Sequence, residues 1–118
     1  MGMAVAETLF IGKGDQDVLL RLKYSNRHGL IAGATGTGKT VTLQTLAQGF
    51  SQAGVPVFVA DVKGDLSGIA VPGGNNPRVA ERLKEFRIEE NFVGCPATFW
   101  DVFGKLGHPV RATVSEMG

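Results

Sequence analysis

The segment Gly33-Ala34-Thr35-Gly36-Thr37-Gly38-Lys39-Thr40 constrains the fold of this chain more than any other, because it fits G-x-x-x-x-G-K-[ST] at every specified position. Residues 29–32, immediately before it, form a short apolar run. Apolar residues at helical spacing follow it: Val41, Leu43, Leu46, Ala47 and Phe50. This pattern holds phosphate when it joins a strand to the N-terminus of a helix. The sequence therefore predicts a phosphate-binding loop within an α/β fold.

Each residue type in this loop suits phosphate binding for its own reason. The glycines let the backbone turn so that amides from about Thr35 to Thr40 converge on a β-phosphate. Lys39 is the predicted catalytic cation on the β- and γ-phosphate oxygens, and Thr40 is the predicted Mg²⁺ ligand. The predicted binding set for ATP or ADP is Gly33, Thr35, Gly36, Thr37, Gly38, Lys39, Thr40 and Val41. Val41 has no polar side chain and begins the apolar helix face; a glycine-rich loop without any ligand is the structural alternative.

The rest of the chain alternates between strand-like and helix-like segments. Thr8–Ile11 and Val18–Leu22 predict a hairpin, and residues 29–32, 55–60 and 97–100 predict buried parallel strands. A weaker strand is predicted from Val110 to Val114. One helix should end before Gly54 and Pro56, and a second should run from Pro77, capped by Asn76, to Phe86. Trp100 is expected in the core.

Length and composition limit the classes of protein this chain can be. Its 118 residues suit one domain, which should bury roughly two-thirds of its unfolded surface. A net charge of +1 gives no strong global attraction to nucleic acid or anionic membrane, and no apolar run is long enough to cross a bilayer. A single cysteine and an N-terminus without signal-peptide character favour a cytoplasmic location and no membrane partner.

Strand number predicts that the α/β sheet is incomplete. About 30 residues per βα unit leave room for three units after the hairpin, whereas doubly wound nucleotide-binding sheets have five or six strands. We expect residues 1–25 to form an N-terminal hairpin. Residues 26–118 would form the front portion of a P-loop ATPase domain, with the phosphate-binding loop present and later elements absent.

Two aspartates could hold the Mg²⁺ ion. Asp61 and Asp101 each follow four apolar or small residues, as does a metal-binding carboxylate at the end of a neighbouring strand. Either would complete a small kinase or GTPase if its strand lay beside residues 29–32. The alternative is that each carboxylate caps the turn that follows it.

Residues 26–44 closely resemble the P-loop segment of the HerA/FtsK superfamily of ATPases, and more narrowly HerA-like bacterial proteins of the YjgR type. Residues 60–68, 99–104 and 107–115 resemble further blocks of that family. The resemblance implies a RecA-like fold with a three-layer parallel sheet, a hexameric ring, and DNA translocation in some members. It also implies later elements, a Walker B pair and an arginine finger, that match no position here. This chain alone is therefore predicted not to be a competent ATPase.

Several other residues have both a functional and a structural interpretation. Asp61, Lys63 and Asp65 lie at the carboxyl end of a predicted strand, where ligands of α/β sheets bind. Scattered arginines could contact DNA phosphates, but are more often solvated: Arg27, Arg78 and Arg82. His28 could approach a nucleotide or a neighbouring subunit, but is more often structural, and His108 is expected in a loop before Pro109. Three functions follow: nucleotide binding within a HerA-like ATPase, possession of a complete small kinase or GTPase site, and phosphate binding without catalysis. Self-association is expected in the first.

Overall fold

The predicted N-terminal hairpin is present in the computed structural model, which describes residues 7–74, 76–86 and 93–111. Strand β1 (Thr8–Lys13) pairs antiparallel with β2 (Asp17–Arg21). Phe10 lies opposite Leu19 and Gly12 opposite Val18, so Ile11 is an extra residue that forms a bulge. The 3-10 helix η1 (Leu22–Tyr24) follows β2 directly.

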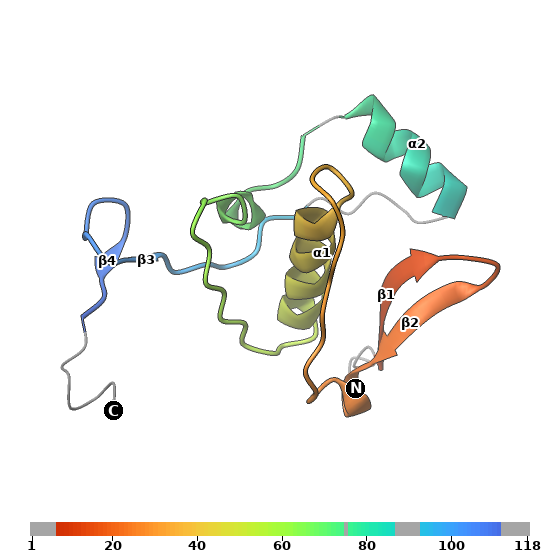
Figure 1. Ribbon diagram of the computed structural model, residues 1–118, viewed down its shortest axis with the longest axis horizontal. Coiled ribbons are helices and arrows are strands. Elements are labelled where there is room, and N and C mark those ends of the chain that lie inside the picture. The colour runs from red at the N-terminus through yellow and green to blue at the C-terminus, as the bar shows by residue number, and fades with distance from the viewer. Residues whose placement is uncertain (1–6, 75, 87–92, 112–118) are drawn as a thin grey trace, which may run out of the picture.

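Helix α1 (Lys39–Gln52) forms where the apolar spacing predicts it and lies at the centre of the molecule (Figure 1). It ends at Gln52, and Gly54, two residues further, adopts a left-handed φ of 81° that favours glycine. The Gly54 amide donates to the Ser51 carbonyl and the Val55 amide to the Phe50 carbonyl, which satisfies the last carbonyls of the helix. A Cβ at Gly49 would lie 3.0 Å from a methyl of Leu9, so this glycine lets β1 pack closely on α1.

Helix α2 (Pro77–Phe86) begins and ends at the residues that the sequence predicts. The Asn76 side-chain oxygen accepts a hydrogen bond from the Arg78 amide at 3.0 Å, as expected of an N-cap. The Phe86 ring lies 5.8 Å from the Phe10 ring, which joins α2 to the hairpin. Between the two α-helices, the polar connection contains the short 3-10 helix η2 (Ser67–Ala70).

The predicted parallel sheet is not formed among the described residues. Residues 29–32 and 55–60 have no strand partner, and Leu30 and Phe58 are 89% and 90% exposed. Strand formation needs a neighbouring chain to accept and donate the ladder hydrogen bonds, and no described segment lies in register beside either run. The structure is therefore a mixed α/β arrangement with two small sheets, and the three-layer RecA-like sheet is not seen.

The second sheet lies in the C-terminal part of the chain and is much shorter than predicted. β3 (Trp100–Asp101) pairs in parallel with β4 (His108–Pro109), with Trp100 opposite His108. Trp100 is 62% exposed, so its predicted place in a core is wrong, because no other layer among the described residues covers this pair. Of the predicted strand at 110–114, residues 110 and 111 are not in a strand, and 112–114 lie outside the described residues.

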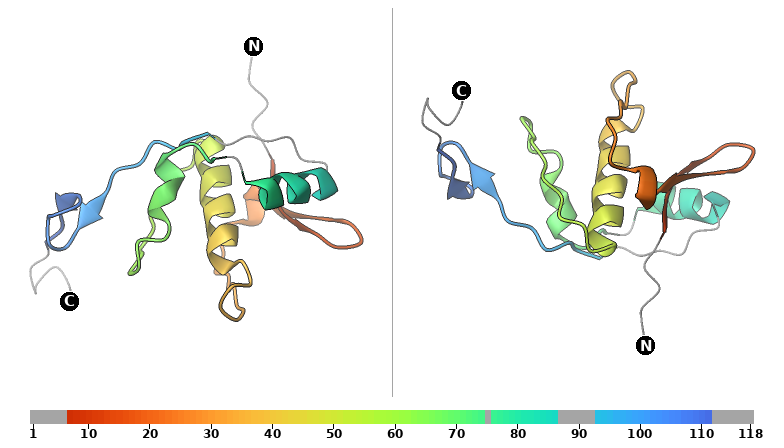
Figure 2. Two further views of the ribbon diagram at one scale, coloured as in Figure 1. Left: turned by 90° about the horizontal axis from the view of Figure 1, so that it is seen from above. Right: turned by 90° about the horizontal axis from the view of Figure 1, so that it is seen from below.

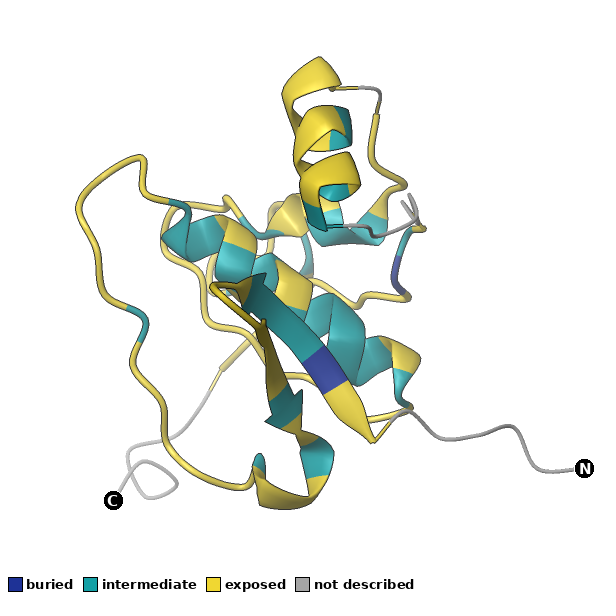
Figure 3. Ribbon diagram, turned by 90° about the vertical axis from the view of Figure 1, so that its right-hand side faces the viewer, coloured by how far each residue is buried: buried dark blue, intermediate teal, exposed yellow. Residues whose placement is uncertain are grey.

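Little of the described chain is buried. Figure 3 shows exposed residues over most of the ribbon, and only Leu9 and Cys95 among the described apolar residues fall in the buried class. The accessible surface of 10453 Å² exceeds the roughly 6,200 Å² of a folded monomer of this mass. The expectation that two-thirds of the unfolded surface is buried is therefore wrong. The hairpin and the β3–β4 pair lie on opposite sides of α1 (Figures 1 and 2).

Candidate functional site

Two features of the loop before α1 favour glycine: backbone conformation at two positions and limited space at a third. Gly36 and Gly38 have φ angles of 81° and 95°, a left-handed conformation that side chains with a Cβ rarely adopt. Gly33 has a different constraint, because a Cβ there would collide with the Thr37 hydroxyl. The loop thus closes tightly on itself before the helix begins at Lys39.

The first turn of α1 presents backbone donors at the end of this loop. The Thr42 amide makes the first hydrogen bond into the helix start, to the Gly38 carbonyl at 3.0 Å. The amides of Lys39, Thr40 and Val41 have no backbone acceptor among the described residues. Such unpaired N–H groups and the helix dipole favour an anion. Val41 therefore offers its amide to this site, although its side chain is apolar.

The side chains of the loop converge on one carbonyl group. The Lys39 ammonium donates to the Ala34 carbonyl oxygen at 2.7 Å, and the Thr37 hydroxyl donates to the same oxygen at 2.6 Å. Lys39 is thus folded back over the loop rather than extended into solvent. Loop residues 33–37 are exposed, while Gly38, Lys39 and Thr40 are half-buried. An incoming phosphate would meet the lysine charge and the helix amides together.

The stretch of sequence that contains the loop is poor in acidic residues. Between Asp17 and Asp61 there is no acidic residue, and there are four permanent cations: Arg21, Lys23, Arg27 and Lys39. The net charge of +1 for the whole chain conceals this excess in the sequence. Lys39, which contacts the Ala34 carbonyl, brings its charge to the loop itself.

Both candidate magnesium carboxylates cap turns. The Asp61 carboxylate accepts hydrogen bonds from the amides of Leu66 at 2.8 Å and Lys63 at 3.1 Å. The Asp101 carboxylate accepts three, from the amides of Phe103, Lys105 and Leu106.

These amide donors lower the pKa of both carboxyl groups. The Leu66 amide is the largest cause of the lowered pKa at Asp61, and the Leu106 amide is the largest at Asp101. Donors to an ionised carboxylate stabilise the charged form. The geometry therefore supports the turn-capping interpretation of Asp61 and Asp101.

The loop of residues 61–66 is nevertheless attached to the helix that starts at the phosphate-binding loop. The Gln44 side-chain amide on α1 donates to the Asp65 carbonyl at 3.1 Å. Gln44 lies four residues after Thr40, one helical turn further on the same face. Sequence reasoning missed Gln44; its i, i+4 spacing from Thr40 is the signal that could have identified it.

The remaining candidate residues make local contacts. Arg27 donates to the backbone and side-chain oxygens of Asn26, and Arg82 pairs with Glu85 at 3.1 Å while lying over the Phe86 ring. The structure therefore does not bring these arginines to the loop. Three further candidates are exposed: His28, Arg78 and His108. The His108 ring lies 5.4 Å from the Trp100 ring.

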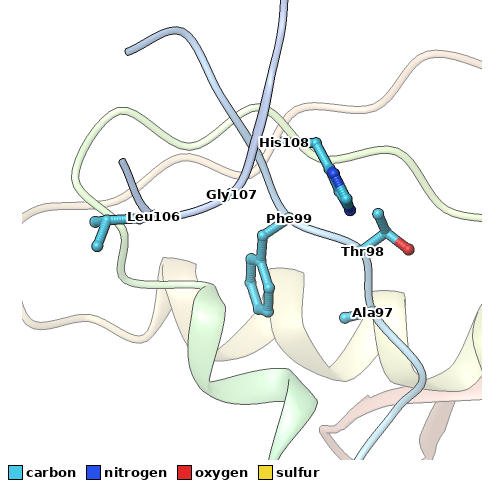
Figure 4. A pocket seen from close by; sticks show the side chains of 6 residues that line it. All are labelled: Ala97, Thr98, Phe99, Leu106, Gly107 and His108. Carbon is cyan, nitrogen blue, oxygen red and sulfur yellow. The ribbon is translucent and has the colours of Figure 1, made fainter. Parts of the chain in front are cut away.

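A hollow lies away from the phosphate-binding loop, between residues 97–99 and 106–108 (Figure 4). Its lining combines polar and apolar groups, and His108 is its one titratable side chain. In the described part of the chain, no group of three or more His, Cys, Asp or Glu residues could hold a metal ion. No helix among the described residues is long and apolar enough to span a membrane. The loop before α1 thus remains the site with convergent polar groups.

Comparison with known proteins shows which family this chain is similar to. Over 87 residues the chain is 37% identical to the ESX secretion system protein EccC of Geobacillus thermodenitrificans. That alignment covers 68% of this chain and 6% of EccC, so the chain corresponds to a small part of that relative. No solved structure matches the chain significantly. The profile of the family described as helicase HerA-like C-terminal matches residues 7–118. The chain therefore belongs to the helicase HerA-like C-terminal family, within the HerA/FtsK superfamily.

Proposed function

We propose that this chain is the nucleotide-binding part of a HerA/FtsK-type ATPase and holds the phosphates of Mg-ATP or Mg-ADP on residues 33–41. The observation that carries this proposal is the junction between the loop and α1, where the amides of residues 39–41 have no backbone acceptor among the described residues and the Lys39 ammonium folds back onto the Ala34 carbonyl. The amides would surround the β-phosphate, and Lys39 would neutralise the β- and γ-phosphate oxygens. Thr40 would offer its hydroxyl to Mg²⁺.

The finer parts of the proposal rest on the resemblance described above. We propose that the whole protein is a HerA-like ATPase of the YjgR type, which assembles as a ring and acts in the cytoplasm as a DNA translocase. In this proposal the two-part division holds, with residues 1–25 as a hairpin and 26–118 as the front of the ATPase domain. The Lys39 ammonium and the first amides of α1 support an anionic ligand but do not distinguish DNA from nucleotide.

The other two functions receive less support. A complete kinase or GTPase site needs a strand that ends in a free carboxylate beside residues 29–32, and Asp61 and Asp101 instead cap turns. Phosphate binding without catalysis remains the outcome if nucleotide binds but an assembled full-length protein shows no turnover.

Removing the lysine charge tests the proposal. Lys39→Ala should weaken Mg-ATP and Mg-ADP binding by about tenfold or more, because a hydrogen bond between charged groups contributes about 1.5 to 3 kcal/mol. Titration calorimetry on the 118-residue chain measures both affinities. Lys105→Ala is the control for the loss of one lysine charge, since Lys105 is exposed and lies in the separate β3–β4 region. Equal affinity in wild type and Lys39→Ala would overturn the proposal.

A further inference from the structure

The loop of residues 61–66 is held in one conformation by its own hydrogen bonds. The Asp61 carboxylate accepts hydrogen bonds from the amides of Lys63 and Leu66, and the Ser67 hydroxyl donates to the Gly64 carbonyl at 2.9 Å. Gly64 adopts a φ of 79°, which allows the backbone to turn back at this point. The loop is therefore a defined structure although it is exposed to solvent.

This loop lies at the same end of α1 as the phosphate-binding loop. The views of Figures 1 and 2 agree on this placement, and the bond from Gln44 to the Asp65 carbonyl fixes it to the first half of α1. Gln44 follows Thr40 by one turn on the same helix face. Since the hydroxyl at the Thr40 position of such loops contacts the Mg²⁺ between the β- and γ-phosphates, the loop lies on the γ-phosphate side of the site.

Lys63 is the one cation in this loop, and nothing within the described residues pairs with its ammonium group. Lys63 and its neighbour Val62 are both exposed. The nearby Asp61 charge is already engaged by amide donors, which leaves the ammonium available for another anion. The Lys63 ammonium stands on a four-carbon side chain, and the bond from Gln44 to the Asp65 carbonyl holds the backbone of its loop against the first half of α1.

We propose that Lys63 is a second phosphate-binding cation, which contacts the γ-phosphate of ATP, and that Gln44 is the positioning residue that holds the Lys63 loop beside the site. This inference rests on the proposed nucleotide-binding function and extends it to a specific phosphate. Lys39 and Lys63 would then approach the nucleotide from separate elements, α1 and the 61–66 loop. Because ADP lacks the γ-phosphate, Lys63 favours the triphosphate over the diphosphate.

The test compares the affinities of the 118-residue chain for Mg-ADP and for a non-hydrolysable Mg-ATP analogue by titration calorimetry. Lys63→Ala should weaken binding of the ATP analogue about fivefold or more and leave Mg-ADP binding unchanged. Lys63→Arg should restore most of the difference because it keeps the charge. Gln44→Met, which keeps the side-chain length without the donor, should show a smaller loss for the ATP analogue. Lys105→Ala is the control for a general loss of positive charge.

Each outcome bears on a separate claim. If Lys63→Ala binds the ATP analogue as wild type does while Lys39→Ala binds it poorly, the Lys63 inference is overturned and the proposed function stands. Equal losses for Mg-ADP and the ATP analogue would overturn the γ-phosphate assignment, and an equal loss in Lys105→Ala would overturn any specific role. If wild type binds neither nucleotide, both proposals fail. Unchanged thermal unfolding of Lys63→Ala is expected, since the side chain has no described partner.

Discussion

At the scale of single residues, the same interaction occurs in two places: an aspartate carboxylate accepts hydrogen bonds from backbone amides of the turn that follows it. Asp61 and Asp101 each precede a glycine-containing turn, and Gly64 and Gly104 both have left-handed φ angles. Each carboxylate replaces water as the acceptor for amides that would otherwise be unpaired. Ionisation of the aspartate strengthens these hydrogen bonds, so the two turns depend on pH.

The pH dependence has a definite sign. Both aspartates have a folded pKa below the ordinary value of 3.8, so their contribution to stability is complete above pH 3.8 and is lost as the pH falls through the folded pKa. The amide NMR signals of Leu66 and Leu106 should therefore titrate with midpoints below 3.8. Asp61→Asn should abolish the transition at Leu66 and leave that at Leu106. Midpoints at or above 3.8 would contradict the capping geometry.

Sequence alone leaves the roles of these aspartates open because two functions use the same residue at the same place. A strand-end carboxylate can hold Mg²⁺ or cap a turn, and only the positions of the Leu66 and Leu106 amides distinguish the two. The loop glycines were predictable, since Gly36 and Gly38 occupy left-handed positions that the motif requires. The contact between Gln44 and Asp65 was not, because it joins residues 21 apart in sequence.

At the scale of elements, the predicted helices are formed and the predicted central strands are not. Helices α1 and α2 are specified by local signals: the spacing of apolar residues, the Asn76 cap, and Gly54 at a C-terminus. A strand depends on a partner that is distant in sequence. Residues 29–32 and 55–60 have the composition of buried strands but no partner among the described residues.

The described residues contain only part of the groups that ATP hydrolysis needs. ATP hydrolysis needs a group that orients the attacking water and, in many NTPases, an arginine finger that contributes about 10³ to 10⁵ in rate. The described residues around α1 supply Lys39 and Thr40 but no such group. We therefore expect negligible phosphate release from ATP by the purified chain, at the level of Lys39→Ala. Turnover near about 1 s⁻¹ that Lys39→Ala abolishes would instead favour a self-contained kinase or GTPase.

At the scale of the whole molecule, the main feature is apolar surface in contact with water. The Cα radius of gyration of 16.6 Å exceeds the roughly 13.5 Å of a compact domain of this length. Exposed large apolar residues occur along much of the described chain, and Leu30 before the loop, Phe58 after α1 and Leu106 before β4 are each 89–90% exposed. Surface of this kind marks sites where other protein segments pack.

This surface leads to a prediction about association. Residues 29–32 and 55–60 combine exposed apolar side chains with backbone groups that lack ladder partners, and such edges pair with other chains. We expect the purified chain to self-associate at about 100 μM, a concentration at which exposed apolar surface promotes aggregation. Sedimentation velocity measures this, and Leu30→Lys with Phe58→Lys should shift the distribution toward monomer. A wild-type chain that is strictly monomeric and unfolds cooperatively would instead mean that these segments are covered within a single finished domain.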